Sequence, residues 1–210
     1  MANISSKNSA AGCDDSINSA TNSYERTSDQ VRALVERARQ GDEQAWEALF
    51  RRAYPKLLSY ASRRLPTQEQ AKDAVGETMT RGVANIERLR GEGGGFDAWM
   101  YGIMRHVVLD AQRLLSREGP GFIPDVADAS PLPGDRVVAR DDAIEVRQAF
   151  DRLSPADQEL LELRVVAQLS ADEVASVLGR RPGAVRMAQS RALSRLRDLL
   201  GEVGEGRESA

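Results

Sequence analysis

Apolar residues recur at intervals of three and four through most of this chain, most regularly near its end. Ser170 and Glu173 stand three residues apart, which is the spacing of a capping box at a helix start. Gly179 suits the left-handed conformation that ends a helix, and Pro182 suits the first position of the next helix. We therefore predict two helices joined by a tight turn, a helix-turn-helix. The apolar stripe of the second helix consists of Val185, Ala188, Ala192, Leu196 and Leu199.

Four helical patterns occupy the first half of the chain, each bounded by a capping residue or a helix breaker. Pro55 falls within the second pattern and predicts a kink or a local break there. Thr67 and Gln70 predict a capping box at the start of the third pattern. Gly76 and Gly82 weaken that helix by about 1 kcal/mol each relative to alanine. The patterns cover residues 28–41, 42–66, 67–89 and 96–114.

The chain as a whole is predicted to be all-α, with two small helical domains, because no segment alternates apolar and polar residues as a strand does. A stretch rich in proline and glycine, residues 116–136, separates them and is typical of a linker. Ser154 and Pro155 predict a further helix start, with an apolar stripe that includes Leu160, Leu161 and Val166. The predicted divisions are a disordered tail over 1–27, a helical domain over 28–117, a linker over 118–138, a helix-turn-helix domain over 139–200 and a fraying tail over 201–210.

Composition argues against a metal centre, an internal disulfide and catalysis that depends on histidine. Cys13 is the sole cysteine and His106 the sole histidine, so neither a zinc ligand set nor a disulfide within the chain can form. No apolar stretch has the length of a signal peptide or a transmembrane helix. We therefore expect a cytoplasmic protein that is not an enzyme and that has no cofactor.

Charge is distributed unevenly over the predicted helix-turn-helix. Residues 179–200 hold six arginines and one aspartate, whereas residues 141–178 hold nine acidic residues and three arginines. Positive charge on the second helix favours insertion into a DNA major groove, although an arginine-rich helix can also be a solvated face or bind a protein partner. The whole chain nevertheless carries a net charge of −3. A DNA-binding protein this acidic is expected to take much of its affinity from another macromolecule.

Three stretches in series resemble the extracytoplasmic-function (ECF) group of bacterial RNA polymerase sigma factors. "AKDAVGETMTRGVANIERLRG" resembles their second conserved region, and "FDAWMYGIMRHVVLDAQRL" resembles the helix that melts the promoter. "LSADEVASVLGRRPGAVRMAQSRALSRLR" resembles the fourth region, with a variant of its second helix that is similar to the actinobacterial sigma-D type. The resemblance spans residues 29–117 and 139–200.

This resemblance implies a transcription-initiation factor that binds core RNA polymerase, promoter DNA and an anti-sigma factor. The first domain would bind the β′ clamp helices and open the minus-ten element, and the second would bind the β flap and read the minus-thirty-five element. The implied polymerase-binding residues are Asp73, Glu77, Arg81 and Arg88. The implied minus-ten residues are Gly93, Gly94, Arg105, His106, Asp110 and Arg113. The implied minus-thirty-five residues are Arg181, Arg186, Met187, Ser190, Arg191 and Arg197, and Arg195 is expected to bind phosphate with them.

The chain departs from the family pattern at three of these places. Gly76 stands where a glutamine is usual, which removes one side-chain contact with polymerase. His106 replaces an asparagine and puts the preferred minus-ten base in doubt. Arg181 replaces a capping serine or threonine. Trp99 lies on an apolar stripe, so we expect it to pack in the core rather than to stack on a base.

Two other functions stay open on sequence grounds. A conventional helix-turn-helix regulator, acting without polymerase as its partner, would need a sensing or receiver domain, and nothing before residue 117 alternates strands and helices as a receiver does. A protein-binding adaptor would not need the basic second helix. Transcription with core polymerase distinguishes these functions from a sigma factor.

Overall fold

The structure is a computed structural model that describes residues 28–89, 95–117 and 140–208, and every regular element in these ranges is helical. The predicted all-α fold is therefore confirmed for this part of the chain. The contacts divide it into two units that meet within one helix, one ending at Leu49 and the other beginning at Phe50. None of the helices described is both long enough and apolar enough to cross a membrane. The expected N-terminal tail and linker lie outside the described residues, so the domain boundaries stay predictions.

The first unit contains a helix over residues 28–39 and the beginning of α2 (Glu43–Ser62). Gly41 has φ +83° between them, as expected for a residue that ends a helix. Asp42 caps α2, because its Oδ1 accepts the backbone N–H of Ala45 at 3.1 Å. This bond, followed by the one from Arg37, lowers the pKa of the Asp42 carboxyl. Both predicted boundaries are thus confirmed.

Helix α2 runs unbroken through Pro55, so the predicted local break is wrong. A proline removes one backbone hydrogen bond from a helix, and packing can offset that cost. Ala53 and Leu57, on either side of the proline, are both buried, as is Tyr60 one turn later. The apolar face of α2 is therefore held in place before and after Pro55.

Helix α3 (Gln68–Asn85) is capped by Thr67, whose hydroxyl accepts the backbone N–H of Gln70 at 3.2 Å. The side-chain Oε1 of Gln70 is buried without a hydrogen-bond partner instead of accepting the N–H of Thr67. The predicted capping box is therefore only half formed. The spacing identified the cap, but the inward position of the glutamine depends on tertiary packing.

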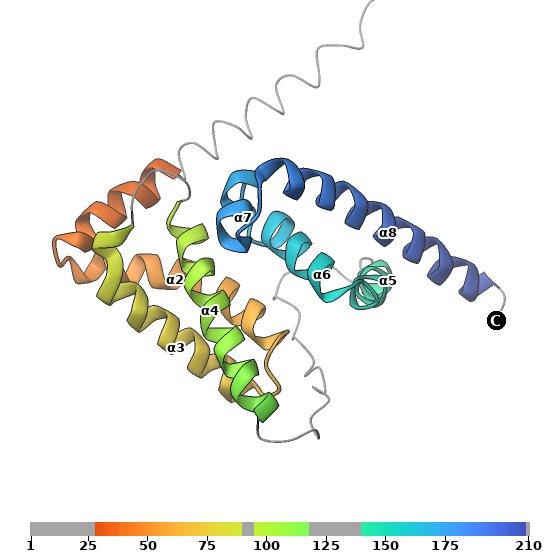
Figure 1. The fold of residues 1–210 in the computed structure, drawn as a ribbon, viewed down its shortest axis with the longest axis horizontal. Coiled ribbons are helices and arrows are strands. Elements are labelled where there is room, and N and C mark those ends of the chain that lie inside the picture. Colours follow the sequence, from red (N-terminus) through yellow and green to blue (C-terminus); the bar gives the residue numbers. More distant parts are fainter. Residues whose placement is uncertain (1–27, 90–94, 118–139, 209–210) are drawn as a thin grey trace, which may run out of the picture. The chain divides into compact units, whose positions relative to one another are not determined.

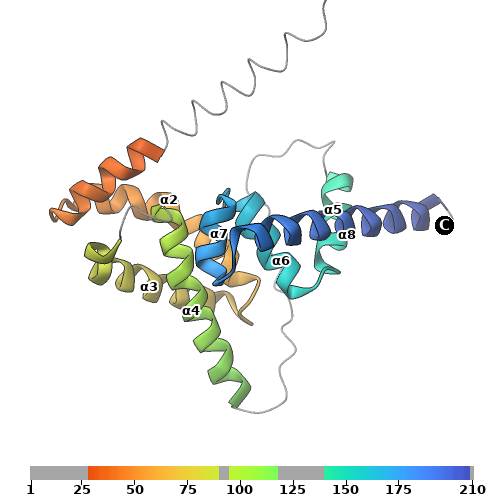
Figure 2. The same cartoon turned by 45° about the horizontal axis from the view of Figure 1, so that its top comes forward.

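Helices α3 and α4 (Phe96–Arg117) pack side by side (Figures 1 and 2). The hydroxyl of the fully buried Thr78 donates to the Ala74 carbonyl at 2.7 Å and lies 3.6 Å from the sulfur of Met104 on α4. Tyr101 of α4 meets Tyr60 of α2 edge to face, with ring centroids 5.6 Å apart. These contacts join the three helices around one apolar core. A short 3₁₀ turn, Ile86–Arg88, follows α3.

The last four helices are α5 (Arg140–Asp151), α6 (Pro155–Leu161), α7 (Ala171–Leu178) and α8 (Pro182–Glu208). A π-helical turn, Glu162–Val166, follows α6 directly. Helices α5, α6 and α7 all contact α8, which is labelled in dark blue in Figure 1. Leu153, Leu161 and Ala192 form the buried centre of this cluster.

Two sequence predictions differ from the structure in this region. Val166 is 49% exposed and not part of the apolar stripe, because the π-helical turn changes the direction of the side chains that follow α6. Helix α8 continues to Glu208, past Gly201, where fraying was expected. Each residue added to an existing helix gains a hydrogen bond without a new nucleation cost, so a glycine weakens a helix without necessarily ending it.

The two glycines of α3 provide a matched test of packing against helix propensity. No atom lies within 4 Å of a Cβ built at Gly76, whereas a Cβ at Gly82 would meet the Met100 sulfur at 3.0 Å. We expect Gly76→Ala to stabilise the protein by up to about 1 kcal/mol through helix propensity. Gly82→Ala should give a smaller gain or a loss, because the fully buried Met100 has to move. Urea unfolding followed by circular dichroism measures both, and an equal gain at the two positions would contradict the close packing of α3 on α4.

Candidate nucleic-acid interface

Hydrogen bonds at both ends of α7 fix the turn that leads into α8. Ser170 and Glu173 form the complete capping box, with the Ser170 N–H donating to the Glu173 carboxylate at 2.7 Å and the Glu173 N–H donating to the Ser170 hydroxyl at 3.2 Å. Gly179 ends α7 in the left-handed conformation, with φ +63°. The N–H of Arg180 then donates to the Ala175 carbonyl at 2.9 Å. The predicted helix-turn-helix is therefore present, with both of its predicted caps.

Helix α8 separates a buried face from an exposed one. Val185 and Ala192 are fully buried, and Ala188, Leu196 and Leu199 are half-buried, in agreement with the predicted apolar stripe. The middle of the exposed face is a line of residues at spacings of four, three and four. Met187 is the most prominent of them, since 65% of its surface is exposed. The line consists of Gly183, Met187, Ser190 and Ser194.

Arginines lie on both sides of this line. At about 100° of rotation per residue, Arg186 and Arg197 fall on one side and Arg191 on the other, and all three are exposed. Arg181 is exposed immediately before the helix, and the first turn of α8 has no acidic residue. The positive end of the helix dipole adds to these charges. The arrangement places small and apolar groups at the centre of the face and cations along its edges.

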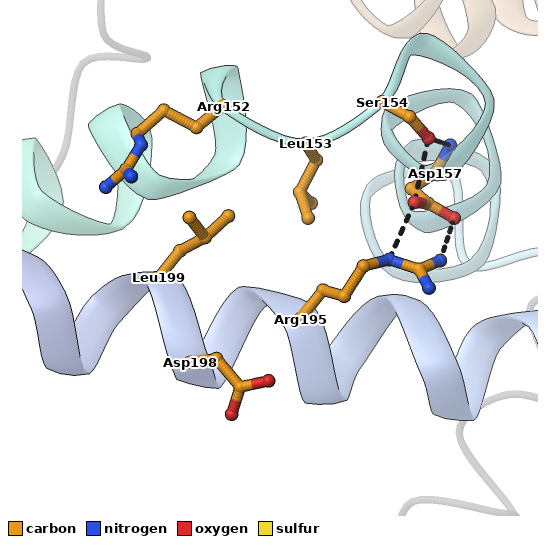
Figure 3. Close-up of a pocket in the computed structure, with 7 residues that line it drawn as sticks. All are labelled: Arg152, Leu153, Ser154, Asp157, Arg195, Asp198 and Leu199. Carbon is orange, nitrogen blue, oxygen red and sulfur yellow. Dashed lines mark hydrogen bonds and ion pairs between the residues drawn. The ribbon is translucent and has the colours of Figure 1, made fainter.

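One arginine of α8 is bound within the protein. Arg195 donates two hydrogen bonds to Asp157 of α6, from Nε at 3.0 Å and from Nη2 at 2.7 Å. The Ser154 hydroxyl also donates to Asp157, at 2.8 Å. Figure 3 shows this pair in a shallow groove whose lining includes Arg152 and Leu199. Arg195 was expected to bind phosphate, but its partner in the structure is Asp157, which spacing could not predict because the two residues are 38 positions apart.

Three of the predicted minus-ten residues of α4 lie along its exposed side, and the fourth, Arg105, is half-buried beside them. His106 is exposed, and its Nδ1 lies 2.7 Å from the Gly102 carbonyl oxygen. A carbonyl only accepts hydrogen bonds, so Nδ1 carries a proton, and in the neutral form of the ring Nε2 is then the acceptor. Asp110 and Arg113 form an exposed ion pair of 3.1 Å. The other two predicted residues, Gly93 and Gly94, lie outside the described residues.

Arg105 already has an anionic partner in the structure. Within the unit that begins at Phe50, its Nε donates to Glu159 at 3.2 Å, and the Tyr60 hydroxyl donates to the same carboxylate oxygen at 2.6 Å. Burial raises the pKa of Tyr60, so its hydroxyl keeps the proton that it donates. One turn beyond Glu159, Glu162 is 3% exposed and accepts a hydrogen bond from Arg64 at 2.7 Å. Sequence spacing gave no signal for these pairs.

The predicted polymerase-binding residues lie on α3 and on the turn after it. Asp73 and Glu77 are exposed one helical turn apart, and Glu77 accepts a hydrogen bond from Arg81 at 2.7 Å. Exposed pairs of this kind contribute little to stability, so this carboxylate can exchange partners at low cost. A Cβ at Gly76, on the same helix, would meet no atom within 4 Å. Arg88 is exposed on the 3₁₀ turn.

Two family models match the chain, one over α3 and α4 with most of α2, and one over the helix-turn-helix and the helices before it. "Sigma-70 region 2" matches residues 49–118, and "Sigma-70, region 4" matches residues 143–196. The ECF RNA polymerase sigma factor ShbA of Streptomyces griseus is 35% identical in an alignment of length 181 that covers 80% of this chain and 94% of that protein. The ECF RNA polymerase sigma factor SigD of Mycobacterium tuberculosis is 32% identical in an alignment of length 184 that covers 84% of this chain and 87% of that protein.

Solved structures share the fold. The sigma factor RpoE of Bartonella quintana, determined with the anti-sigma factor NepR, matches 74% of this chain and 96% of its own, with a TM-score of 0.60 and 23% identity. CnrH, determined with the cytosolic domain of CnrY, matches 81% of this chain and 97% of its own, with a TM-score of 0.58 and 22% identity.

The pair of Arg195 and Asp157 gives a pH-dependent prediction. Burial alone would raise the pKa of Asp157, but hydrogen bonds from Arg195 and Ser154 hold it below the ordinary value of 3.8. A lowered pKa stabilises the folded state above the ordinary value, and this contribution is lost as the pH falls through the lowered one. We expect Asp157→Asn to cost about 1–3 kcal/mol at pH 7, as for a hydrogen bond to a charged group, and less below pH 3.8. Urea unfolding of the wild type and the variant at pH 7 and below pH 3.8 measures this cost. The same difference in unfolding free energy at both pH values would contradict the prediction.

Proposed function

Since the chain belongs to the ECF group of the sigma-70 family and is a transcription-initiation sigma factor, we propose which of its surfaces bind promoter DNA and RNA polymerase. Sigma factors are non-catalytic, so the surfaces bind and position but perform no reaction. The observation that carries the assignment is the exposed face of α8, where arginines lie on both sides of a line of small and apolar residues.

This face of α8 reads the minus-thirty-five element. A helix in the major groove contacts base edges with its N-terminal turns, which here carry Arg186, Met187 and Ser190. Arg186 can bind the O6 and N7 atoms of a guanine, and Met187 can contact a thymine methyl group. Arg181, Arg191 and Arg197 are placed at the edges, where the phosphates of the two strands would pass.

The outer side of α4 reads the minus-ten element. In its neutral form, His106 with a proton on Nδ1 offers Nε2 as an acceptor to the exocyclic amine of an adenine or cytosine, whereas an asparagine amide carries both a donor and an acceptor. Asp110 and Arg113 share this side of α4, Arg105 flanks it, and Gly93 and Gly94 precede the helix. Arg105 reaches DNA by exchanging Glu159 for another acceptor.

Core RNA polymerase binds α3 and the turn that follows it. We assign Asp73, Glu77, Arg81 and Arg88 to the β′ clamp helices and the helix-turn-helix domain to the β flap. Polymerase supplies the affinity that a chain with a net charge of −3 does not gain from DNA alone. We place the protein in the cytoplasm, where it meets polymerase.

An anti-sigma factor is the proposed regulatory partner. Two proteins that share this fold, RpoE and CnrH, were determined with NepR, an anti-sigma factor, and with the cytosolic domain of CnrY. A partner of this kind would inhibit the protein by covering the α3 and α4 surfaces that polymerase and the minus-ten element need.

Promoter-selective transcription tests the proposed function. The purified chain is combined with sigma-free core RNA polymerase on a genomic promoter library, and transcription starts are mapped by sequencing. Starts that share two motifs at a fixed spacing support a sigma factor. Binding of DNA without polymerase, and no specific starts with it, would instead indicate a conventional regulator.

Arg186 and Arg197 separate base reading from phosphate binding on the same helix. We expect Arg186→Ala to lower transcription about tenfold from promoters with the preferred minus-thirty-five element and to relax the preference at one base pair. Arg197→Ala should weaken transcription from all promoters equally and reduce the salt dependence by about one phosphate contact. The same templates at two salt concentrations measure both effects. A uniform loss with Arg186→Ala would contradict its role in reading a base.

The acidic face of α3 gives a prediction for polymerase binding. We expect the double variant Asp73→Asn, Glu77→Gln to weaken binding to core polymerase by more than tenfold, because each close charge pair across an interface can contribute about 1.5 kcal/mol or more. Asp29→Asn, which removes an exposed acid on the first helix, is the matched control. Fluorescence anisotropy of the labelled chain measures affinity. Equal affinities of the double variant and the wild type would exclude this face from the interface.

A further inference from the structure

The chain between α6 and α7 adopts two unusual backbone conformations in succession. The π-helical turn Glu162–Val166 closes with a bond from the Ala167 N–H to the Glu162 carbonyl at 2.9 Å. Gln168 then has φ +59°, the single positive φ found at a non-glycine residue among those described. A left-handed conformation outside glycine is rarely populated and persists only where the surroundings fix it. Some neighbouring group must therefore hold this turn.

Arg164 is the side chain that holds it. Its Nη1 donates to the carbonyl oxygen of Leu169, the residue just before the N-cap of α7. Its Nε donates to the side-chain Oε1 of Gln189 on α8, at 2.8 Å. A guanidinium is planar, so two donors on one group fix the direction between their acceptors. Arg164 thus connects the start of α7 to a side chain of the recognition helix α8.

Gln189 lies where this connection can set the rotation of α8. It is half-buried between the inner face of Val185 and Ala192 and the exposed face. It directly precedes Ser190, and Arg186 lies one turn earlier on the same side. A rotation of α8 about its own axis would move Met187 and Ser190 together relative to the DNA groove. The hydrogen bond from Arg164 to Gln189 opposes that rotation.

We propose that Arg164 is a positioning residue that determines the minus-thirty-five base preference by holding Gln189 and thereby the rotation of α8. The inference rests on the proposed function, since it specifies how the same face of α8 is oriented. Arg164 need not contact DNA in this role. Its effect is transmitted by two hydrogen bonds from different nitrogens, Nε and Nη1, a geometry that lysine cannot reproduce because its donors all share one nitrogen.

The test compares base preference and not only activity. The holoenzyme is assembled with wild type, Arg164→Lys, Gln189→Ala, the double variant, or Arg180→Lys, which changes an exposed arginine outside this connection. Each transcribes a set of templates that contains every single-base change in the minus-thirty-five element, with the minus-ten element constant. The melting temperature of each variant is measured in parallel.

We expect Arg164→Lys and Gln189→Ala to change the preference at the same base positions by about three- to tenfold, the range of one or two hydrogen bonds. The double variant should change it no further, because both substitutions break one connection. Arg180→Lys should leave the preference unchanged. Gln189→Ala keeps Arg164 and its bond to Leu169, so it remains informative if Arg164→Lys lowers the melting temperature.

Other outcomes would overturn the inference. An equal loss on all templates with Arg164→Lys, together with no change for Gln189→Ala, would mean that Arg164 only stabilises the fold or binds a phosphate. Additive changes at different base positions would mean that the two residues act separately. A wild-type holoenzyme with no minus-thirty-five preference would instead refute the proposed function on which the inference rests.

Discussion

The left-handed turn at Gly179 is the constraint on which the nucleic-acid interface depends. It allows α7 to stop and α8 to start within three residues, so the capping box at one end of α7 and the buried Val185 of α8 belong to one rigid unit. A residue with a Cβ would adopt this φ of +63° only at a cost. Without the turn, α8 would still pack on α5 and α6, but its first turns would no longer be fixed beside α7.

Arginine in this protein has two distinct uses, and sequence composition does not separate them. Arg164 and Arg195 donate to groups inside the fold, and they cap turns or join helices. Arg186 and Arg197 are exposed on α8 and have the positions of ligand-binding groups. A count of six arginines over residues 179–200 therefore overstates the cationic surface. The structure gives a smaller set, at the edges of one face, which agrees better with an acidic protein that binds DNA together with a partner.

Local signals predicted much of the fold because they act over a few residues. The caps at Asp42, Thr67 and Ser170, the glycine at Gly179 and the stripe of α8 were all evident from spacing and residue type.

Predictions failed where the packing of other parts of the fold determines the local conformation or the partner of a side chain. Pro55 does not break α2, Gln70 turns away from its cap, and the π-helical turn exposes Val166. The partners of Arg64, Arg105 and Arg195 are 98, 54 and 38 positions away, beyond any spacing rule. The residues assigned to DNA and polymerase follow from the resemblance. Of those that the structure describes, Arg81 and Arg105 are half-buried and paired, and the others are exposed.

The contact between Arg105 and Glu159 has a consequence for how selectivity arises. An anion that binds Arg105 has to replace a carboxylate that is already there, so the free energy gained is the difference between two acceptors and not the full strength of one. A phosphate of DNA of any sequence binds Arg105 with a free energy little more favourable than that of the carboxylate it displaces. Because this internal pair is partly buried, salt screens it less than an exposed contact, so high salt favours Glu159 over a phosphate as the partner of Arg105. An internal competitor thus reduces indiscriminate attraction to DNA, and binding then depends on the contacts that differ between one sequence and another.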